Sequence, residues 1–167
     1  MISKQQFLDS LLLDFKILSH LYQKITPKML DYRPSPKQRS LLELLQYLSH
    51  FVSIEAQAIA SGSAINDFQG AMAEAYQMPA EKFLEQMKKQ EGLIKEVFDR
   101  LTEEQMHEEI DLFGRGRPQA RSLWFLNLIL KSLTAYKMQL FLYLKANGLH
   151  NLNTSNLWRG EDTAPQT

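Results

Sequence analysis

Apolar side chains recur at helical spacing in four long segments of this chain, and this periodicity limits the fold more than any other feature. In the first segment, residues 3–22, the apolar positions lie three or four residues apart, so they share one face of a helix. These positions are Phe7, Leu11, Phe15, Leu18 and Tyr22. No segment alternates apolar and polar residues as a half-buried strand does. The sequence therefore predicts an all-α fold, a four-helix bundle with long connections between its helices.

Local signals predict where the first two helices begin. Ser3 with Gln6 and Ser40 with Glu43 are capping boxes, in which each side chain bonds the backbone of the other residue. The second helix is predicted to continue without interruption until the small residues 61–63 stop it. Its inward positions are Leu41, Leu44, Leu45, Leu48, Val52 and Ile59.

Prolines and small residues mark the connections. Pro27 ends the first helix, because the residue before a proline avoids the α-helical conformation, and residues 31–39 are predicted to be extended. Residues 61–78 form a connection with one short helical turn, and Pro79 suits the first turn of the third helix. Residues 102–119 are predicted to form a loop with one helical turn. The inward positions of the third helix are Phe83, Met87, Ile94, Val97 or Phe98, and Leu101.

The fourth helix, predicted from about Ala120 to Asn147 with Gly148 just after its end, is apolar on nearly every face. A helix of that kind is either central in its own bundle or covered by a second subunit. We therefore expect a homodimer through the apolar faces of the bundle. Sedimentation as a monomer at high micromolar concentration would contradict this expectation.

The chain length of 167 residues is close to that of one domain. We expect residues 1–150 to form the bundle and residues 151–167 to form a polar C-terminal tail. Leu157 and Trp158 are predicted to hold this tail against the bundle, and the residues beyond them are expected to be disordered.

Charge and cysteine content exclude several functional classes. The 19 Lys and Arg residues balance 19 Asp and Glu residues, so no overall field attracts nucleic acid or anionic lipid. The chain has no cysteine, which excludes a cysteine nucleophile and thiolate metal ligands and fits a reducing cytoplasm. No stretch reaches the roughly 18 apolar residues that a membrane span needs, and no signal-peptide pattern begins the chain. We expect a cytoplasmic protein with neither membrane nor nucleic-acid partners.

Three motifs lie at matching places in the chain. Tyr32-Arg33-Pro34-Ser35-Pro36 precedes Ser40-Leu41-Leu42-Glu43-Leu44-Leu45. In the last helix, Tyr136-Lys137-Met138-Gln139-Leu140 is followed by Tyr143-Leu144-Lys145, and Gly148 comes directly after that helix. Together they resemble the DinB-like superfamily of four-helix bundles, with its aromatic-x-Pro connector, its S-[IL]-x-E-L-L helix start and its H-R-G-Q-L-x-x-Y-L-R segment. Length and helix order agree, so the resemblance covers nearly the whole chain.

The resemblance implies a metal site of three histidines, one from the second helix and a His-x-x-x-His pair from the last. Such a site holds zinc, nickel or a similar ion, and some relatives use it to activate a low-molecular-weight thiol. In this sequence the three positions fall on Tyr47, Ser132 and Tyr136. A neutral phenol or alcohol is a poor ligand for such ions. We therefore expect no bound metal, no cofactor and no metal-activated thiol chemistry.

The former metal site is predicted to be a ligand-binding pocket or a filled cavity. The residues predicted to line it are Tyr47, His50, Ser132, Tyr136 and Gln139. In one interpretation these polar groups bond one another and plug the cavity, because buried hydroxyls need partners. In the other they line a pocket for a small molecule. The leading hypothesis is a DinB-like protein that has lost its metal and binds a small molecule or a protein partner.

An enzymatic alternative is a residual transferase or hydrolase. It would use His50 as a general base, with Tyr47 or Tyr136 as a hydrogen-bond donor. His50 lies one helical turn after Tyr47, so both are expected to face the same cavity. The competing interpretation is a partly buried histidine that makes one hydrogen bond.

Two further patterns have mainly structural interpretations. Glu103, His107 and Asp111 have the spacing of a metal-chelating ladder, but they lie in an acidic run that is more typical of a solvated turn. The segment 115–118, Arg-Gly-Arg-Pro, matches the core of a minor-groove DNA-binding hook. Without a basic flank it is predicted to be an inter-helix loop, or an arginine pair that binds an anion with Arg121 nearby. His20 and His150 have no partner in register, and no role is predicted for them.

Overall fold

The structure, a computed structural model, describes residues 3–63, 65 and 67–163. Its elements, in chain order, are α1 (Lys4–Tyr22), η1 (Pro27–Met29), α2 (Leu41–Leu48), α3 (Phe51–Ser61), α4 (Phe68–Ala71), η2 (Ala75–Gln77), η3 (Ala80–Lys82), α5 (Phe83–Arg100), α6 (Glu103–His107), β1 (Glu109–Ile110), β2 (Gln119–Ala120), α7 (Arg121–Trp124), η4 (Phe125–Leu130), α8 (Lys131–Ala146) and α9 (Thr154–Trp158). The elements η1, η2 and η3 are 3-10 turns, and η4 is π-helical.

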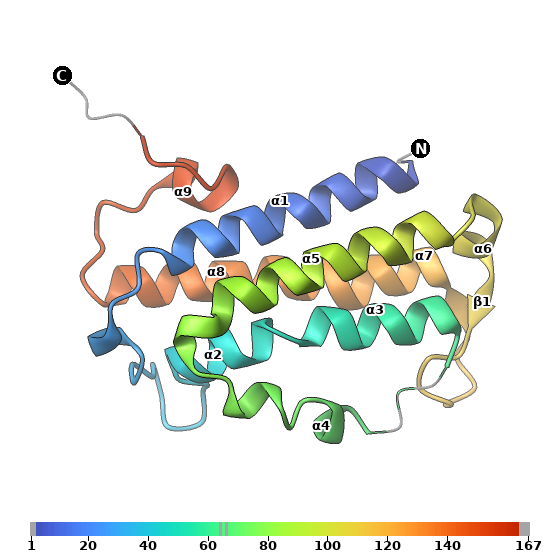
Figure 1. The fold of residues 1–167 in the computed structure, drawn as a ribbon, viewed down its shortest axis with the longest axis horizontal. Helices are drawn as coiled ribbons and strands as arrows, with labels where there is room; N and C mark the ends of the chain where they lie inside the picture. The colour runs from blue at the N-terminus through green and yellow to red at the C-terminus, as the bar shows by residue number, and fades with distance from the viewer. Residues whose placement is uncertain (1–2, 64, 66, 164–167) are drawn as a thin grey trace.

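Four helical rods run along the long axis of the molecule: α1, α5, α2 followed by α3, and the run from α7 through η4 to α8 (Figure 1). Helix α1 packs against α5 and α8, while α3 packs against α5 and η4. The predicted inward leucines and phenylalanines meet between the rods; Leu11, Phe15, Leu44 and Phe83, for example, are almost completely buried. This arrangement confirms the predicted all-α four-helix bundle.

Both predicted capping boxes are present. The backbone N–H of Gln6 donates to Ser3 Oγ at 3.1 Å, and the N–H of Ser3 donates to Gln6 Oε1 at 2.9 Å. Ser40 and Glu43 make the same reciprocal pair, at 3.2 and 2.7 Å. Gly148 has a φ of 95° just after α8, a conformation that favours glycine and ends the helix as predicted.

The second predicted helix is not continuous, which corrects the sequence prediction. Helix α2 ends at Leu48, and α3 begins at Phe51 after His50, whose φ of −137° is not helical. Ser49 and Ser53 support the interruption, because their hydroxyls donate to the carbonyls of Gln46 and His50 at 2.6 and 2.7 Å. The break ends the regular helical spacing between Tyr47 and His50.

Gln90 of α5 bridges this break. Its Nε2 donates to the carbonyl of Leu48 at 2.8 Å, and its Oε1 accepts from the N–H of Ser53 at 3.1 Å. Gln90 is only 3% exposed. The buried amide of Gln90 therefore bonds a carbonyl in the last turn of α2 and an N–H in the first turn of α3. Backbone groups at helix ends have no partner inside their own helix.

Replacing Gln90 with alanine should lower the free energy of unfolding by about 2–4 kcal/mol, because the buried carbonyl of Leu48 and the partly buried N–H of Ser53 lose their partners. Chemical denaturation of the variant measures this loss. Gln57→Ala, an exposed position on α3, is the matched control and should change stability by less than about 1 kcal/mol. Equal stability of the two variants would contradict the bridging role.

A short antiparallel strand pair precedes the last rod, where the sequence predicts a loop. Glu109 pairs with Ala120 and Ile110 with Gln119. Strands of two residues are too short to show an alternating pattern, so the sequence carries no signal for them. The predicted helical turn in this segment is present as α6.

The last rod is buried mainly by its own bundle. Phe125, Ile129, Leu133 and Leu140 are fully buried, whereas Leu123 and Leu142 are 45% and 54% exposed. Among the described residues, no helix combines the length and the apolarity that crossing a bilayer requires.

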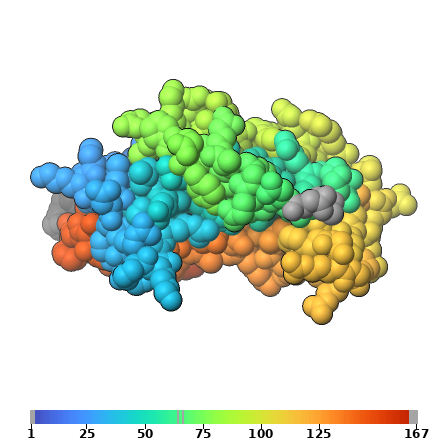
Figure 2. Space-filling view, turned by 90° about the horizontal axis from the view of Figure 1, so that it is seen from below, coloured from blue at the N-terminus to red at the C-terminus, as the bar shows by residue number. Residues whose placement is uncertain are grey.

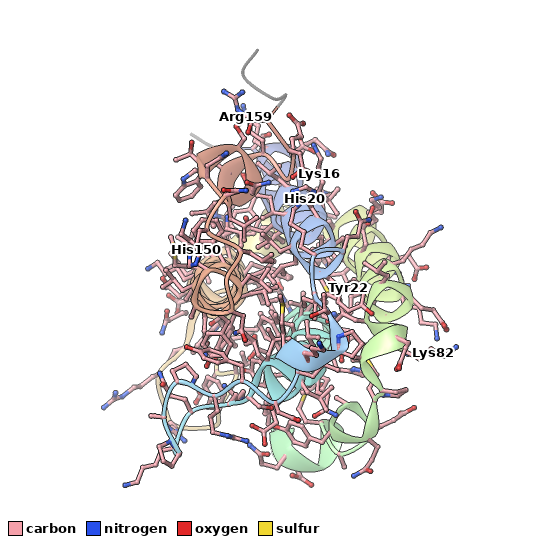
Figure 3. The ribbon with its side chains drawn as sticks, turned by 90° about the vertical axis from the view of Figure 1, so that its left-hand side faces the viewer. Lys16, His20, Tyr22, Lys82, His150 and Arg159 are labelled. Atoms are coloured by element: carbon pink, nitrogen blue, oxygen red, sulfur yellow. The ribbon has the colours of Figure 1, made fainter. Side chains whose placement is uncertain are left out.

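The C-terminal segment packs against α1 through α9. Lys16 pairs with Glu161 at 2.8 Å and Lys24 with Asp162 at 2.6 Å, and Figure 3 shows Lys16 and His20 of α1 beside the segment that carries Arg159. Leu157 is buried, as predicted, whereas the Trp158 side chain is half exposed and its ring covers the ammonium group of Lys137 at 4.9 Å. The sequence analysis expects disorder beyond Trp158, whereas residues 159–163 are ordered against α1 through Glu161 and Asp162. Residues 164–167 lie outside the described residues.

The connection from α3 to α5 lies across one face of the bundle, on the side shown in Figure 2. It contains α4 and η2, and η2 contacts α2. The short helical turn predicted for this connection is therefore present, although it is divided between two elements.

Candidate functional site

Tyr47 of α2 and Tyr136 of α8 meet across the bundle. Their ring centroids are 5.0 Å apart, with the rings inclined at 61°. Phe51, the first residue of α3, stacks on Tyr47 at 5.0 Å and meets Tyr136 edge-on at 5.8 Å. Phe68 of α4 lies 6.2 Å from Tyr47. We call these four residues the aromatic cluster. It contains two of the three positions to which the family resemblance assigns metal ligands.

Arg39, from the connector before α2, covers the aromatic cluster. Its guanidinium carbon lies 4.1 Å from the ring centroid of Tyr47 and 5.7 Å from that of Tyr136. The ring faces of tyrosine are negative and attract cations at such distances. The connector is held in place because Tyr143 donates its hydroxyl to the carbonyl of Arg39 at 2.9 Å.

Gln139 and Ser132 occupy different places relative to this cluster. Gln139 donates to the hydroxyl of Tyr143 at 2.6 Å. Because that hydroxyl donates to the carbonyl of Arg39, Gln139 helps to hold the connector that carries Arg39. Ser132 lies one turn before Tyr136 on α8 and is partly buried, so the two side chains share one face of that helix. The rings of Tyr47 and Tyr136 pack against each other, and a hydrogen bond between their side chains contributes to the raised pKa of Tyr47. The filled cavity and the ligand pocket of the sequence analysis both stay predictions.

Burial raises the pKa of Tyr47 above its ordinary value, and the nearby Tyr136 and Glu55 raise it further. The side chain is 9% exposed. Its phenol is therefore neutral at physiological pH and cannot supply the phenolate that a metal ion would need.

Glu55 of α3 is the residue of this region that the sequence analysis missed. It follows Phe51 by one helical turn, is 6% exposed, and its Oε2 has no hydrogen-bond partner in the part of the chain that the structure describes. Burial raises the pKa of its carboxyl to about 8. A sequence signal existed, because position 55 belongs to the inward stripe of Leu48, Val52 and Ile59 and yet holds a charged residue. Buried titratable groups with shifted pKa values are concentrated at functional sites.

His50 does not face the aromatic cluster, which corrects the expectation that it shares a cavity with Tyr47. It lines a separate pocket of about 270 Å³ with residues from 74 to 86, and its Nδ1 lies 2.6 Å from Ser49 Oγ. Burial lowers its pKa, with Lys89 acting in the same direction and Glu74 against it. The break between α2 and α3 is the physical reason, because it ends the helical spacing on which the expectation depended.

The donor set at the aromatic cluster does not fit the metal ion that the resemblance implies. Tyr47 is a neutral phenol, Tyr136 is packed edge-on against it, and Ser132 offers an alcohol, whereas zinc and nickel favour imidazole or thiolate. Among residues 3–63, 65 and 67–163, no three His, Asp or Glu side chains gather as metal ligands.

The spacing of Glu103, His107 and Asp111 does not produce a chelating ladder. Helix α6 ends at His107, and the carboxylate of Asp111 accepts from the N–H groups of Arg115 and Gly116 at 3.1 and 2.6 Å. Asp111 therefore organises the loop between the two strands.

Two arginines of residues 115–121 contact neighbouring parts of the protein. Arg115 lies 5.6 Å above the ring of Phe113. Arg121 donates to the carbonyls of Ile59 and Gln105 at 3.0 and 3.1 Å and pairs with Glu108. Arg121 thus ties α3 and α6 to the start of the last rod, and the segment 115–118 is the inter-helix loop of the prediction.

Comparison with known proteins shows what the fold resembles. No family model and no curated protein matches the chain. A DinB-like protein from Bacillus subtilis (YjoA) shares 23% identity, with a TM-score of 0.67 over 86% of this chain and 92% of that chain. A DinB-like protein from Bacillus cereus shares 16%, with a TM-score of 0.65 over 86% and 92%. A protein assigned to the DinB family from Exiguobacterium sibiricum shares 19%, with a TM-score of 0.66 over 93% and 99%.

Proposed function

Since the chain has the fold of the DinB-like proteins, we propose that it is a small-molecule-binding protein of the cytoplasm. Its ligand would bind at the aromatic cluster, without the metal ion that the family resemblance implies. The observation that carries this proposal is the buried Oε2 of Glu55, which has no hydrogen-bond partner among the described residues and lies one helical turn after Phe51, whose ring stacks on Tyr47. A polar group left without a partner destabilises the fold, and a ligand that supplies the partner removes that cost.

The aromatic cluster has the chemistry of a binding site. Ligand sites combine apolar and aromatic walls with a few polar groups that orient the ligand. Here the rings supply the walls, and the guanidinium of Arg39 and the carboxyl of Glu55 supply the polar groups. Arg39 is partly exposed, so its side chain can move aside for a ligand without unfolding a helix.

The enzymatic alternative has less support. It requires His50 beside Tyr47 or Tyr136, and His50 lines a different pocket. A general base must reach the proton that it removes, directly or through one water molecule. We therefore assign no catalytic role to His50.

A fragment screen by ligand-observed NMR tests the proposal. The wild-type protein should bind several aromatic fragments, and Tyr136→Leu should remove that binding, because Tyr136 forms one wall of the site. Phe113→Leu, which replaces a partly exposed ring in the loop between the strands, is the matched control and should bind the same fragments as the wild type.

Two outcomes would contradict the proposal. One is a screen in which Tyr136→Leu binds the same fragments as the wild type. The other is a stoichiometric transition metal in protein purified without an affinity tag, measured by elemental analysis, since the proposal requires a site that works without one.

The homodimer remains a prediction of the sequence. Leu123 and Leu142, at opposite ends of the last rod, are exposed and would be covered in such a dimer. Sedimentation velocity at high micromolar concentration decides between dimer and monomer.

A further inference from the structure

We propose that the aromatic cluster binds an organic cation, a molecule whose ammonium group pairs with the carboxylate of Glu55 and lies against the aromatic rings. This inference rests on the proposed function and names the chemical class of its ligand. Three features of the described residues support it: the rings, the arginine that already covers them, and the unpaired carboxyl behind them.

The rings present a surface that attracts positive charge. Tyr47, Phe51, Phe68 and Tyr136 come from α2, α3, α4 and α8, with neighbouring centroids 5.0–6.2 Å apart. Clusters of aromatic rings bind alkylammonium groups because each ring face is negative. The same rings offer little to an anion.

Arg39 shows that this surface accepts a cation. Its guanidinium lies 4.1 Å from the ring centroid of Tyr47. The group comes from the connector before α2 and is partly exposed. A ligand ammonium that reaches the ring would take the place of the guanidinium, so the two cations compete for one position.

The carboxyl of Glu55 holds its proton at pH 7 when no cation is near, because its pKa is about 8, and a bound ammonium group favours the carboxylate form that pairs with it. Its carboxyl is 6% exposed, and no hydrogen bond to its Oε2 exists within the structure. Glu55 lies one helical turn after Phe51, whose ring stacks on Tyr47, so Glu55 and Phe51 share one face of α3. Burial is the one influence that shifts its pKa, without any contribution from a cation. A buried carboxylate without a cation favours a ligand that brings one.

Three probes of similar shape and different charge test the inference: 2-phenylethylammonium, 2-phenylethanol and 3-phenylpropanoate. Their dissociation constants are measured at pH 7 by NMR titration of the full chain with labelled tyrosine rings. The ammonium should bind at least about tenfold more tightly than the alcohol, and the carboxylate should bind most weakly.

Variants of the two charged residues should change these affinities in opposite directions. Glu55→Gln, which keeps the shape of the side chain, should weaken binding of 2-phenylethylammonium about tenfold and leave 2-phenylethanol unchanged. Arg39→Gln should tighten binding of the ammonium, because the competing guanidinium is gone. Glu96→Gln, at an exposed position of α5, is the matched control and should leave all three affinities unchanged.

The outcomes separate this inference from the proposed function. Equal affinity for ammonium and alcohol, or binding of the ammonium that Glu55→Gln leaves intact, overturns the cation class while the binding site stands. If no probe and no screened fragment gives binding that Tyr136→Leu removes, both proposals fail together.

Discussion

Replacing Lys137 with methionine should lower the free energy of unfolding by about 3–5 kcal/mol, because it leaves the carboxylate of Asp14 buried without its partner. Asp14 of α1 and Lys137 of α8 are 5% and 3% exposed and form an ion pair inside the bundle. Thr134 donates its hydroxyl to the other carboxylate oxygen at 2.7 Å. Urea denaturation at pH 7, followed by circular dichroism, measures the loss.

Two controls separate the unpaired charge from the loss of a lysine. Lys95→Met removes an exposed partner of Glu91 on α5 and should change stability by less than about 1 kcal/mol. The double variant Asp14→Leu with Lys137→Met removes both charges and should recover most of the stability lost in Lys137→Met, since a buried ion pair and an apolar pair are often of similar stability. If Lys137→Met is as stable as Lys95→Met, the ion pair of Asp14 and Lys137 does not contribute to the stability of the fold.

Replacing Glu55 with glutamine should have the opposite effect on stability to Lys137→Met. It should raise the free energy of unfolding at pH 7 by about 3 kcal/mol. In the unfolded chain this carboxyl ionises near its ordinary pKa of 4.5, whereas burial raises its pKa in the folded protein to about 8. Between these values the unfolded state loses its proton first. Each pH unit therefore favours unfolding by about 1.4 kcal/mol.

The pH dependence provides the sharper measurement. The contribution of Glu55 to wild-type stability is fully present below about pH 4.5 and is lost as the pH rises to about 8. The difference between Glu55→Gln and wild type should therefore be small at pH 4.5 and grow to about 4 kcal/mol at pH 8. Denaturation curves at intervals of one pH unit test this. Glu96→Gln, at an exposed site, should follow the wild type, and a destabilised Glu55→Gln would mean that the carboxyl already has a partner.

The same substitution connects stability with the proposed ligand. Glu55→Gln is expected to be more stable than the wild type, so weaker binding of 2-phenylethylammonium by this variant cannot result from unfolding. A polar group that lowers stability and strengthens binding is typical of a binding site, where structure is selected for function as well as for folding.

The aromatic centre of the candidate site could be predicted from the sequence, and its charged groups could not. The family resemblance assigns Tyr47 and Tyr136 to one site, and their rings are 5.0 Å apart. Arg39 lies in a connector without periodicity, so nothing in the sequence places its guanidinium above Tyr47. Glu55 interrupts an apolar stripe, which marks it as unusual, but its lack of a partner depends on every element around it.

The sequence by itself determined the helices, their caps and the faces that they bury. Periodicity, capping boxes and the glycine after the last helix act within a few residues, so one chain is enough to read them. Only the tertiary structure decided the break at His50, because Gln90, which bridges it, lies 37 residues after Ser53 in the chain. The tertiary structure also decided the pairing of Asp14 with Lys137, which are 123 residues apart. The reason is physical: the free energy of a buried polar group depends on which partner the fold brings to it, and that partner can lie anywhere in the chain.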